Sequence, residues 1–140
     1  MTNEPINETP DRIAGAALLA LLVVSAVMLL ALVTKTPPHP PLATPIFALG
    51  PFIGASLAVG GAALFLSLTG NPAWRYAAIL FAVTILPSFG PQKFLVPEFP
   101  EIWPAVILAQ ISLVTLVVRL VSSFRTSRWA TAQAEGKPIR

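Results

Sequence analysis

The sequence predicts an all-α, polytopic membrane protein: an antiparallel bundle of four transmembrane helices. Hydrophobic residues make up 55% of the 140-residue chain and charged residues only 11%, far below the roughly 25% charged residues of a soluble domain. Four long apolar segments are separated by short connections rich in proline. Most of the Lys and Arg residues fall on one side of these segments, as the positive-inside rule predicts for membrane proteins.

The first apolar segment covers residues 13–33 and contains no charge. A helix of this length extends ~31 Å, enough to cross a hydrocarbon core of ~30 Å. A cleaved signal peptide is the competing interpretation, but the apolar run is too long for one and the residues before it are acidic. We therefore expect a first span at 13–33, preceded by a cytoplasmic tail at residues 1–12.

The second segment covers residues 45–68 and is also uncharged. The connection before it contains four prolines and cannot be helical, because proline lacks the N–H group and clashes with the preceding turn. Pro51 leaves two alternatives. The helix is kinked at Pro51, or it begins there, since proline is favoured at the first helical position.

The third segment, residues 73–89, follows a clear turn signal. Gly70 is suited to end one helix, Asn71 to cap the next, and Pro72 to occupy its first turn. These residues predict a tight helical hairpin. Pro87 makes this segment the weakest span, because about 15 helical residues extend only ~22 Å and require a kink, burial or local membrane thinning.

The fourth segment covers residues 102–124. Residues 88–101 combine glycine, prolines, charges and phenylalanines, which predicts a loop at the membrane interface. Residues 125–140 are basic and polar, and we expect them to form a cytoplasmic C-terminal tail.

Basic residues favour one orientation of these four spans. Seven of the nine Lys and Arg residues lie on the side of the two termini: Arg12, Arg75, Arg119, Arg125, Arg128, Lys137 and Arg140. The other side carries Lys35 and Lys93. Positive-inside bias therefore predicts a cell-membrane protein with both termini in the cytoplasm. The Ala-, Leu- and Pro-rich composition is compatible with a bacterial inner membrane.

Several functional classes are excluded by residues that the chain lacks. It has no cysteine and one histidine, which excludes disulfides, thiol chemistry, cysteine-bound metal and bis-histidine haem. No hydrolase, nucleotide-binding or metalloprotease motif is present. The basic residues are dispersed, which argues against nucleic acid. We therefore expect a protein that is not an enzyme and holds no cofactor or metal.

A small-residue strip runs along the second span and consists of Gly50, Gly54, Ala58 and Gly61. Such residues let two helix backbones approach closely, and Gly50 with Gly54 matches the GxxxG pattern. Packing inside one subunit is the favoured interpretation, because the pattern has low specificity. A face for a partner or for oligomerisation is the alternative.

Polar residues within the fourth span are Gln110, Ser112, Thr115 and Arg119. Gln110 lies near mid-membrane, where an amide must find a partner. An interhelical hydrogen bond is the favoured role, and a substrate contact is the alternative. Arg119 lies about one turn from the cytoplasmic end, so we expect its long side chain to reach water there.

Polar residues on the predicted outer side are His39, Lys93, Glu98 and Glu101. Glu98 and Glu101 have the chemistry for cation binding or for acid–base catalysis. Pro97 and Pro100 preclude a regular helix between them, which favours a solvated loop. His39, among prolines, is expected to be exposed and to titrate near neutral pH.

Three functions fit this pattern. The leading hypothesis is a non-enzymatic accessory or assembly subunit that packs against a larger membrane complex. The first alternative is a homo-oligomeric facilitator or channel whose path is lined by the polar residues of the fourth span. The weaker alternative is a membrane enzyme that acts on a lipid-linked substrate through Glu98, Glu101 and His39. The expected partners are the lipid bilayer and other membrane subunits or further copies of the chain.

Overall fold

The computed structural model describes residues 11–36 and 46–134, and the side chains of residues 11–36 and 47–127. This part of the chain contains no strand and folds into the following helices: α1 (Arg12–Thr34), α2 (Ile46–Leu68), α3 (Trp74–Phe89), the 3-10 helix η1 (Pro91–Leu95) and α4 (Phe99–Ala134). Four stretches are long and apolar enough to cross a membrane, the third of them including η1. The predicted all-α class is confirmed, and the chain is a small multi-pass membrane protein.

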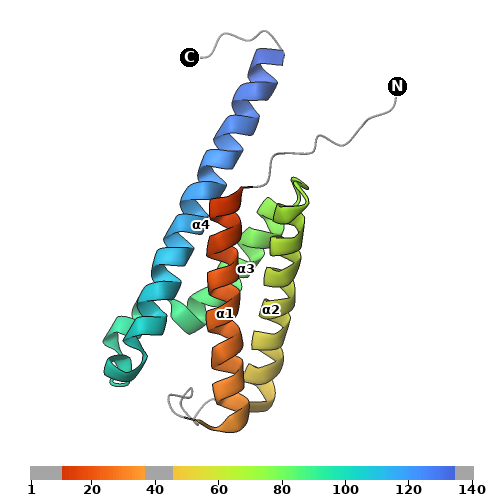
Figure 1. The fold of residues 1–140 in the computed structure, drawn as a ribbon. Helices are drawn as coiled ribbons and strands as arrows, with labels where there is room; N and C mark the ends of the chain where they lie inside the picture. Colours follow the sequence, from red (N-terminus) through yellow and green to blue (C-terminus); the bar gives the residue numbers. More distant parts are fainter. Residues whose placement is uncertain (1–10, 37–45, 135–140) are drawn as a thin grey trace.

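Successive long helices run in opposite directions, so that α1 begins and α4 ends at the same end of the molecule (Figure 1). We call this the termini end and the opposite one, with η1, the loop end. The helix α1 packs against both α2 and α4, and α2 also packs against α3. The contact between α3 and α4 is much smaller.

Local signals explain where α1 begins and where α2 ends. The carboxylate of Asp11 caps α1 by accepting hydrogen bonds from the backbone N–H groups of Ile13 and Ala14, each 3.1 Å long. Gly70 ends α2 in the left-handed conformation, with φ 67°. The Asn71 side chain then accepts a 2.9 Å hydrogen bond from the Ala73 N–H. The predicted hairpin turn is therefore confirmed, and α3 begins just after it.

Two helices differ from the predicted spans. The second segment is helical from residue 46, so α2 contains Pro51 and does not begin there. The predicted loop at 88–101 contains η1 and the first turn of α4, which begins at Phe99. The helix α4 has 36 residues and extends well beyond the predicted 102–124. It continues through residues 125–134 because no glycine or proline interrupts them and Arg, Ala and Gln, which favour helix, are frequent among them.

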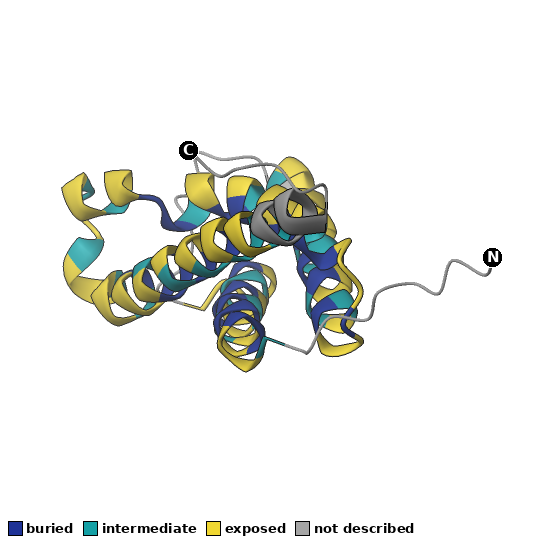
Figure 2. Cartoon of the chain, turned by 90° about the horizontal axis from the view of Figure 1, so that it is seen from above, coloured by how far each residue is buried: buried dark blue, intermediate teal, exposed yellow. Residues whose placement is uncertain are grey.

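The core lies between the four long helices, with most of its buried residues on α1, α3 and α4. Buried residues line the inner faces of the helices, while exposed ones face outward (Figure 2). The largest fully buried side chains include Phe81, Leu18 and Leu21. A Cβ atom on Gly60 would lie 2.6 Å from Phe81 Cζ and 2.8 Å from Leu22 Cδ2. A larger residue at position 60 would therefore force Phe81 and Leu22 to shift where α2 approaches α1 and α3.

Candidate functional site

The small-residue strip of α2 faces away from the other helices. A Cβ atom added to Gly50, Gly54 or Gly61 would meet no atom within 4 Å in the described part of the chain, and Ala58 is exposed. Packing inside one subunit, which the sequence favoured, therefore does not occur at these glycines. The strip is an open face of the protein.

The glycine that packs internally is Gly60, which sequence reasoning missed. It belongs to a buried line on α2 that follows helical spacing: Ile53, Ser56, Gly60, Ala63 and Ser67. Small residues dominate this line as well as the outward strip. The spacing of Ser56, Gly60, Ala63 and Ser67 was the available signal, because it repeats every three or four residues.

A hydrogen bond between two hydroxyl groups joins α2 to α3, and sequence reasoning missed this pair too. Ser56 Oγ lies 2.7 Å from Thr84 Oγ1, and Thr84 donates a 2.8 Å hydrogen bond to the Phe81 carbonyl. Ser56 is therefore the donor to Thr84. Such a bond within a membrane replaces the water that is absent there.

The polar residues of α4 are engaged within the protein. Gln110 donates a hydrogen bond from Nε2 to the Phe89 carbonyl at the end of α3, which matches the interhelical bond expected from the sequence. Thr115 donates to the Ile111 carbonyl of its own helix, and Ser112 is buried. Gln110 and Thr115 are therefore bonded to backbone carbonyl groups.

Arg119 pairs with Asp11 at the termini end. Its Nε lies 2.7 Å from Asp11 Oδ2, so that one carboxylate both caps α1 and holds α4. Partial burial by itself raises the pKa of Asp11, but the hydrogen bond and charge of Arg119, with the N–H groups of Ala14 and Ile13, outweigh it and lower the pKa below 3.8. Sequence reasoning missed the role of Asp11, although an Asp two residues before an apolar run is a helix-cap signal.

A second arginine at this end, Arg75, joins α3 to α4. Arg75 is buried, donates a 2.8 Å hydrogen bond from Nη1 to Ser127 Oγ, and lies with its guanidinium carbon 5.5 Å from the centre of the Phe124 ring. At the termini end, α4 is thus joined to α3 through Arg75 and to the start of α1 through Arg119.

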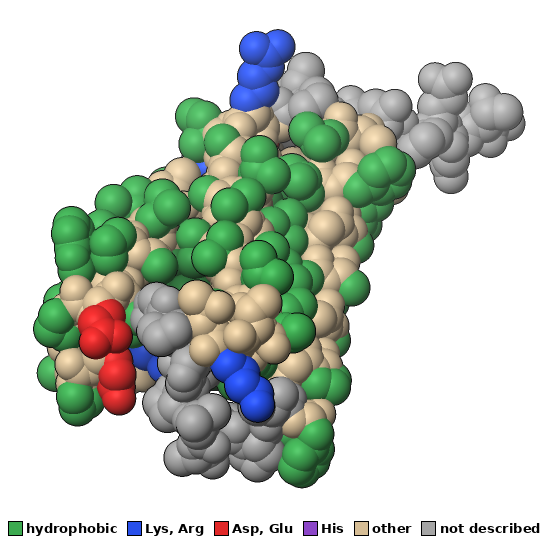
Figure 3. Space-filling view, turned by 60° about the horizontal axis from the view of Figure 1, so that its bottom comes forward, with side chains coloured by type: hydrophobic (Ala, Val, Ile, Leu, Met, Phe, Trp, Pro, Cys, Tyr) green, Lys and Arg blue, Asp and Glu red, His purple; other side chains and the backbone are tan. Residues whose placement is uncertain are grey.

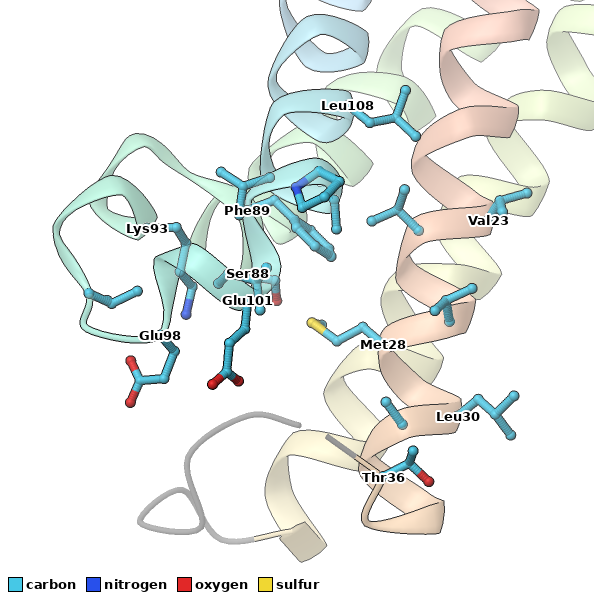
Figure 4. A pocket seen from close by; sticks show the side chains of 18 of the residues that line it. Val23, Met28, Leu30, Thr36, Ser88, Phe89, Lys93, Glu98, Glu101 and Leu108 are labelled. Atoms are coloured by element: carbon cyan, nitrogen blue, oxygen red, sulfur yellow. The ribbon is translucent and has the colours of Figure 1, made fainter. Parts of the chain in front are cut away.

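The loop end contains an open groove of about 1250 Å³ between α1, α2, the end of α3, η1 and the start of α4. Its walls are mainly apolar and include Val24, Met28, Leu49, Phe52, Phe89 and Val106. Lys93, Glu98 and Glu101 also line it, and their side chains point toward the outer end of the groove (Figure 4). Sequence reasoning missed this groove because it depends on how the helices diverge.

The structure therefore brings together three of the four predicted outer-side residues. In the described part of the chain, no hydrogen bond or ion pair engages the side chains of Lys93, Glu98 or Glu101. The fourth residue, His39, lies outside the described residues. Among residues 11–36 and 46–134, no group of three or more His, Cys, Asp and Glu side chains could hold a metal ion.

Comparison of the chain with protein-family models, curated proteins and solved structures finds no match. Function must therefore be inferred from the geometry of the chain itself.

Proposed function

We propose that the protein is a non-enzymatic accessory or assembly subunit that packs against a larger membrane protein through the small-residue strip of α2. One observation carries this proposal. Gly54 and Gly61 have open space around them, so that a helix of another protein can approach the α2 backbone there. Phe47 and Phe65, 82% and 65% exposed, lie on the same side of α2 and flank the strip.

Glycine on an outward helix face lowers the stability of the helix unless something requires it there. Glycine destabilises a helix by about 1 kcal/mol relative to alanine, and no neighbour among the described residues requires it at positions 54 and 61. Close packing of a partner helix supplies the missing reason, because small residues are what allow helix backbones to approach in lipid.

The alternatives receive less support from the described residues. A channel lined by α4 needs polar groups that are free to face a solute, whereas Gln110 and Arg119 bind Phe89 and Asp11. An enzyme at the loop end needs a fixed catalytic group. Glu98 and Glu101 are exposed and are held by no partner in the described part of the chain.

The test is to purify a tagged copy from its native membrane in mild detergent and to measure the mass and protein content of the intact particle. We expect a stoichiometric complex with a larger membrane protein. The Gly54→Leu, Gly61→Leu double variant should lose this partner without losing thermal stability of its own, because a Cβ atom at either position meets no described atom within 4 Å. Ala55→Leu is the matched control, since residue 55 is exposed but lies off the strip.

Two results would overturn the proposal. One is a particle that contains only this chain, as a monomer or a homo-oligomer. The other is a complex that survives in the double variant, which would place the partner on another face.

A further inference from the structure

We propose that the groove at the loop end binds one membrane phospholipid with a zwitterionic amine headgroup, such as phosphatidylethanolamine. In this arrangement the acyl chains occupy the apolar walls, the ammonium group lies near Glu98 and Glu101, and the phosphate lies near Lys93. This inference does not depend on the partner proposed for α2, because the strip and the groove involve different residues.

The groove exists because α3 is too short to fill its end of the bundle. With 16 residues α3 extends ~24 Å, whereas the 23 residues of α1 extend ~35 Å. Gln110 binds the carbonyl of Phe89, and Gln92 folds back to the carbonyls of Leu86 and Pro87, at 2.7 and 3.2 Å. Beyond this point η1 and the start of α4 stand apart from α1 and α2 (Figure 1).

The size and lining of the groove fit acyl chains. Its volume of about 1250 Å³ exceeds the ~300–1,000 Å³ typical of small-molecule pockets. Val23, Val27 and Leu30 line one side and are each more than half exposed, so the groove is open along α1 toward the membrane. No water is available within a bilayer to fill such a space, and an acyl chain is the apolar group at hand.

The charges at the groove indicate which headgroup fits. One basic side chain, Lys93, and two acidic side chains, Glu98 and Glu101, line the groove. Acidic side chains gather at one edge of the loop end, while hydrophobic side chains cover the adjoining flank (Figure 3). A headgroup with an ammonium and a phosphate complements both signs, whereas a purely anionic headgroup would be repelled by the two carboxylates.

Figure 4 shows the polarity of the groove directly. The charged groups lie at its outer end, and Val23 and Leu108 lie at the other. Met28 extends its thioether into the space between them, where a flexible side chain adapts to a chain of variable shape. The division into an apolar interior and a charged rim is the form expected of a site for an amphiphile.

The experiment reconstitutes the protein into vesicles of equimolar phosphatidylethanolamine and phosphatidylglycerol with identical acyl chains. The protein is then extracted in mild detergent, and native mass spectrometry identifies the lipids that remain bound. We expect retained phosphatidylethanolamine to exceed phosphatidylglycerol by about threefold, the scale of one or two exposed ion pairs.

Two sets of variants separate the headgroup from the acyl chains. The Glu98→Gln, Glu101→Gln variant should bring the ratio of the two lipids close to one. Ala31→Phe with Ala105→Phe fills the groove and should reduce retention of both lipids. Ala16→Phe is the matched control, because residue 16 is exposed on α1 away from the groove, and it should retain lipid as the wild type does.

Equal retention of both lipids by the wild type would overturn the proposal and indicate general annular lipid. So would an unchanged ratio in the Gln variant, or full retention in the Phe variant. Thermal unfolding of every variant checks that the fold is intact, and Lys93→Gln provides a milder substitution, expected to weaken retention of phosphatidylethanolamine with no change in unfolding temperature.

Discussion

The two faces of α2 use the same small residues for different purposes. Gly60 faces inward, where an added Cβ would collide with Phe81 and Leu22, while its neighbour Gly61 faces outward into open space. The inward glycine is required by the fold of one subunit. The outward one is not, so its presence indicates a requirement that lies outside the subunit.

This contrast follows from the solvent. Lipid is as apolar as the side chains and supplies no hydrophobic drive between helices, so association depends on close packing and on a few hydrogen bonds. The inward face uses both, through Gly60 against Phe81 and Ser56 against Thr84. The outward face offers small residues for close packing, and none of the helices that the structure describes packs against its glycines.

Gly60→Leu should have the largest effect on stability. Insertion of large side chains into a packed interior costs about 1–3 kcal/mol, occasionally more, and we expect the upper part of this range because two helices meet at Gly60. Denaturant-induced unfolding in detergent micelles measures it. Gly61→Leu is the matched control and should be no less stable than the wild type, because leucine favours a helix more than glycine does. Equal destabilisation by both substitutions would mean that the two faces are not distinct.

Gly54→Leu with Gly61→Leu should have the largest effect on the partner. We expect the affinity for the larger membrane protein to fall at least about tenfold, equivalent to about 1.4 kcal/mol, because the leucine side chains separate the two helix backbones. Titration of the purified partner in detergent measures this. Unchanged affinity would mean that the outward face of α2 is not used.

Substitutions of Asp11 provide a change in stability that involves neither face of α2. Asp11→Ala removes the helix cap and the pair with Arg119 and should cost about 1–2 kcal/mol. Asp11→Asn keeps the cap acceptor and removes the charge, so it should cost about half as much. The partner should bind both variants as it binds the wild type, and loss of binding would show that stability and association are not separable.

The same carboxylate predicts a pH dependence. The pKa of Asp11 is lower in the folded protein than its usual 3.8, so its ionised form stabilises the fold above about pH 4. This contribution is lost as the pH falls through the lowered pKa. The difference in stability between the wild type and Asp11→Asn should therefore shrink below pH 4, as unfolding measured at several pH values would reveal. A constant difference would contradict the pairing.

Ser56→Ala should have the smallest effect. Hydrogen bonds between membrane helices contribute about 0.6 kcal/mol on average, and we expect a loss of this size in micelle unfolding. Thr84→Val removes this bond and also the bond from Thr84 to the Phe81 carbonyl, so it should cost somewhat more. The double variant should cost little more than Thr84→Val alone, because the bond between the two hydroxyl groups is already lost. Additive losses would mean that the two hydroxyl groups act independently.

The sequence predicted the fold class, the approximate spans and the turn at Gly70 and Asn71, because apolar length, proline and glycine act locally. It did not predict which of Gly60 and Gly61 faces inward, since helical spacing gives relative angles but no neighbours. The pair between Asp11 and Arg119 joins residues 108 positions apart, and no local signal connects them. The groove could not be predicted from the sequence either, because it results from how far α3 extends beside α1.

The most direct test of the account places a photoreactive residue at Ala58 on the strip and, separately, at Ala55 beside it, with crosslinking in the native membrane. We expect the protein at position 58 to form a discrete adduct with a larger membrane protein, and the protein at position 55 to crosslink mainly to lipid. The same pattern at both positions, or an adduct at position 58 that consists of two copies of this chain, would contradict the proposal that the outward face of α2 binds a larger partner.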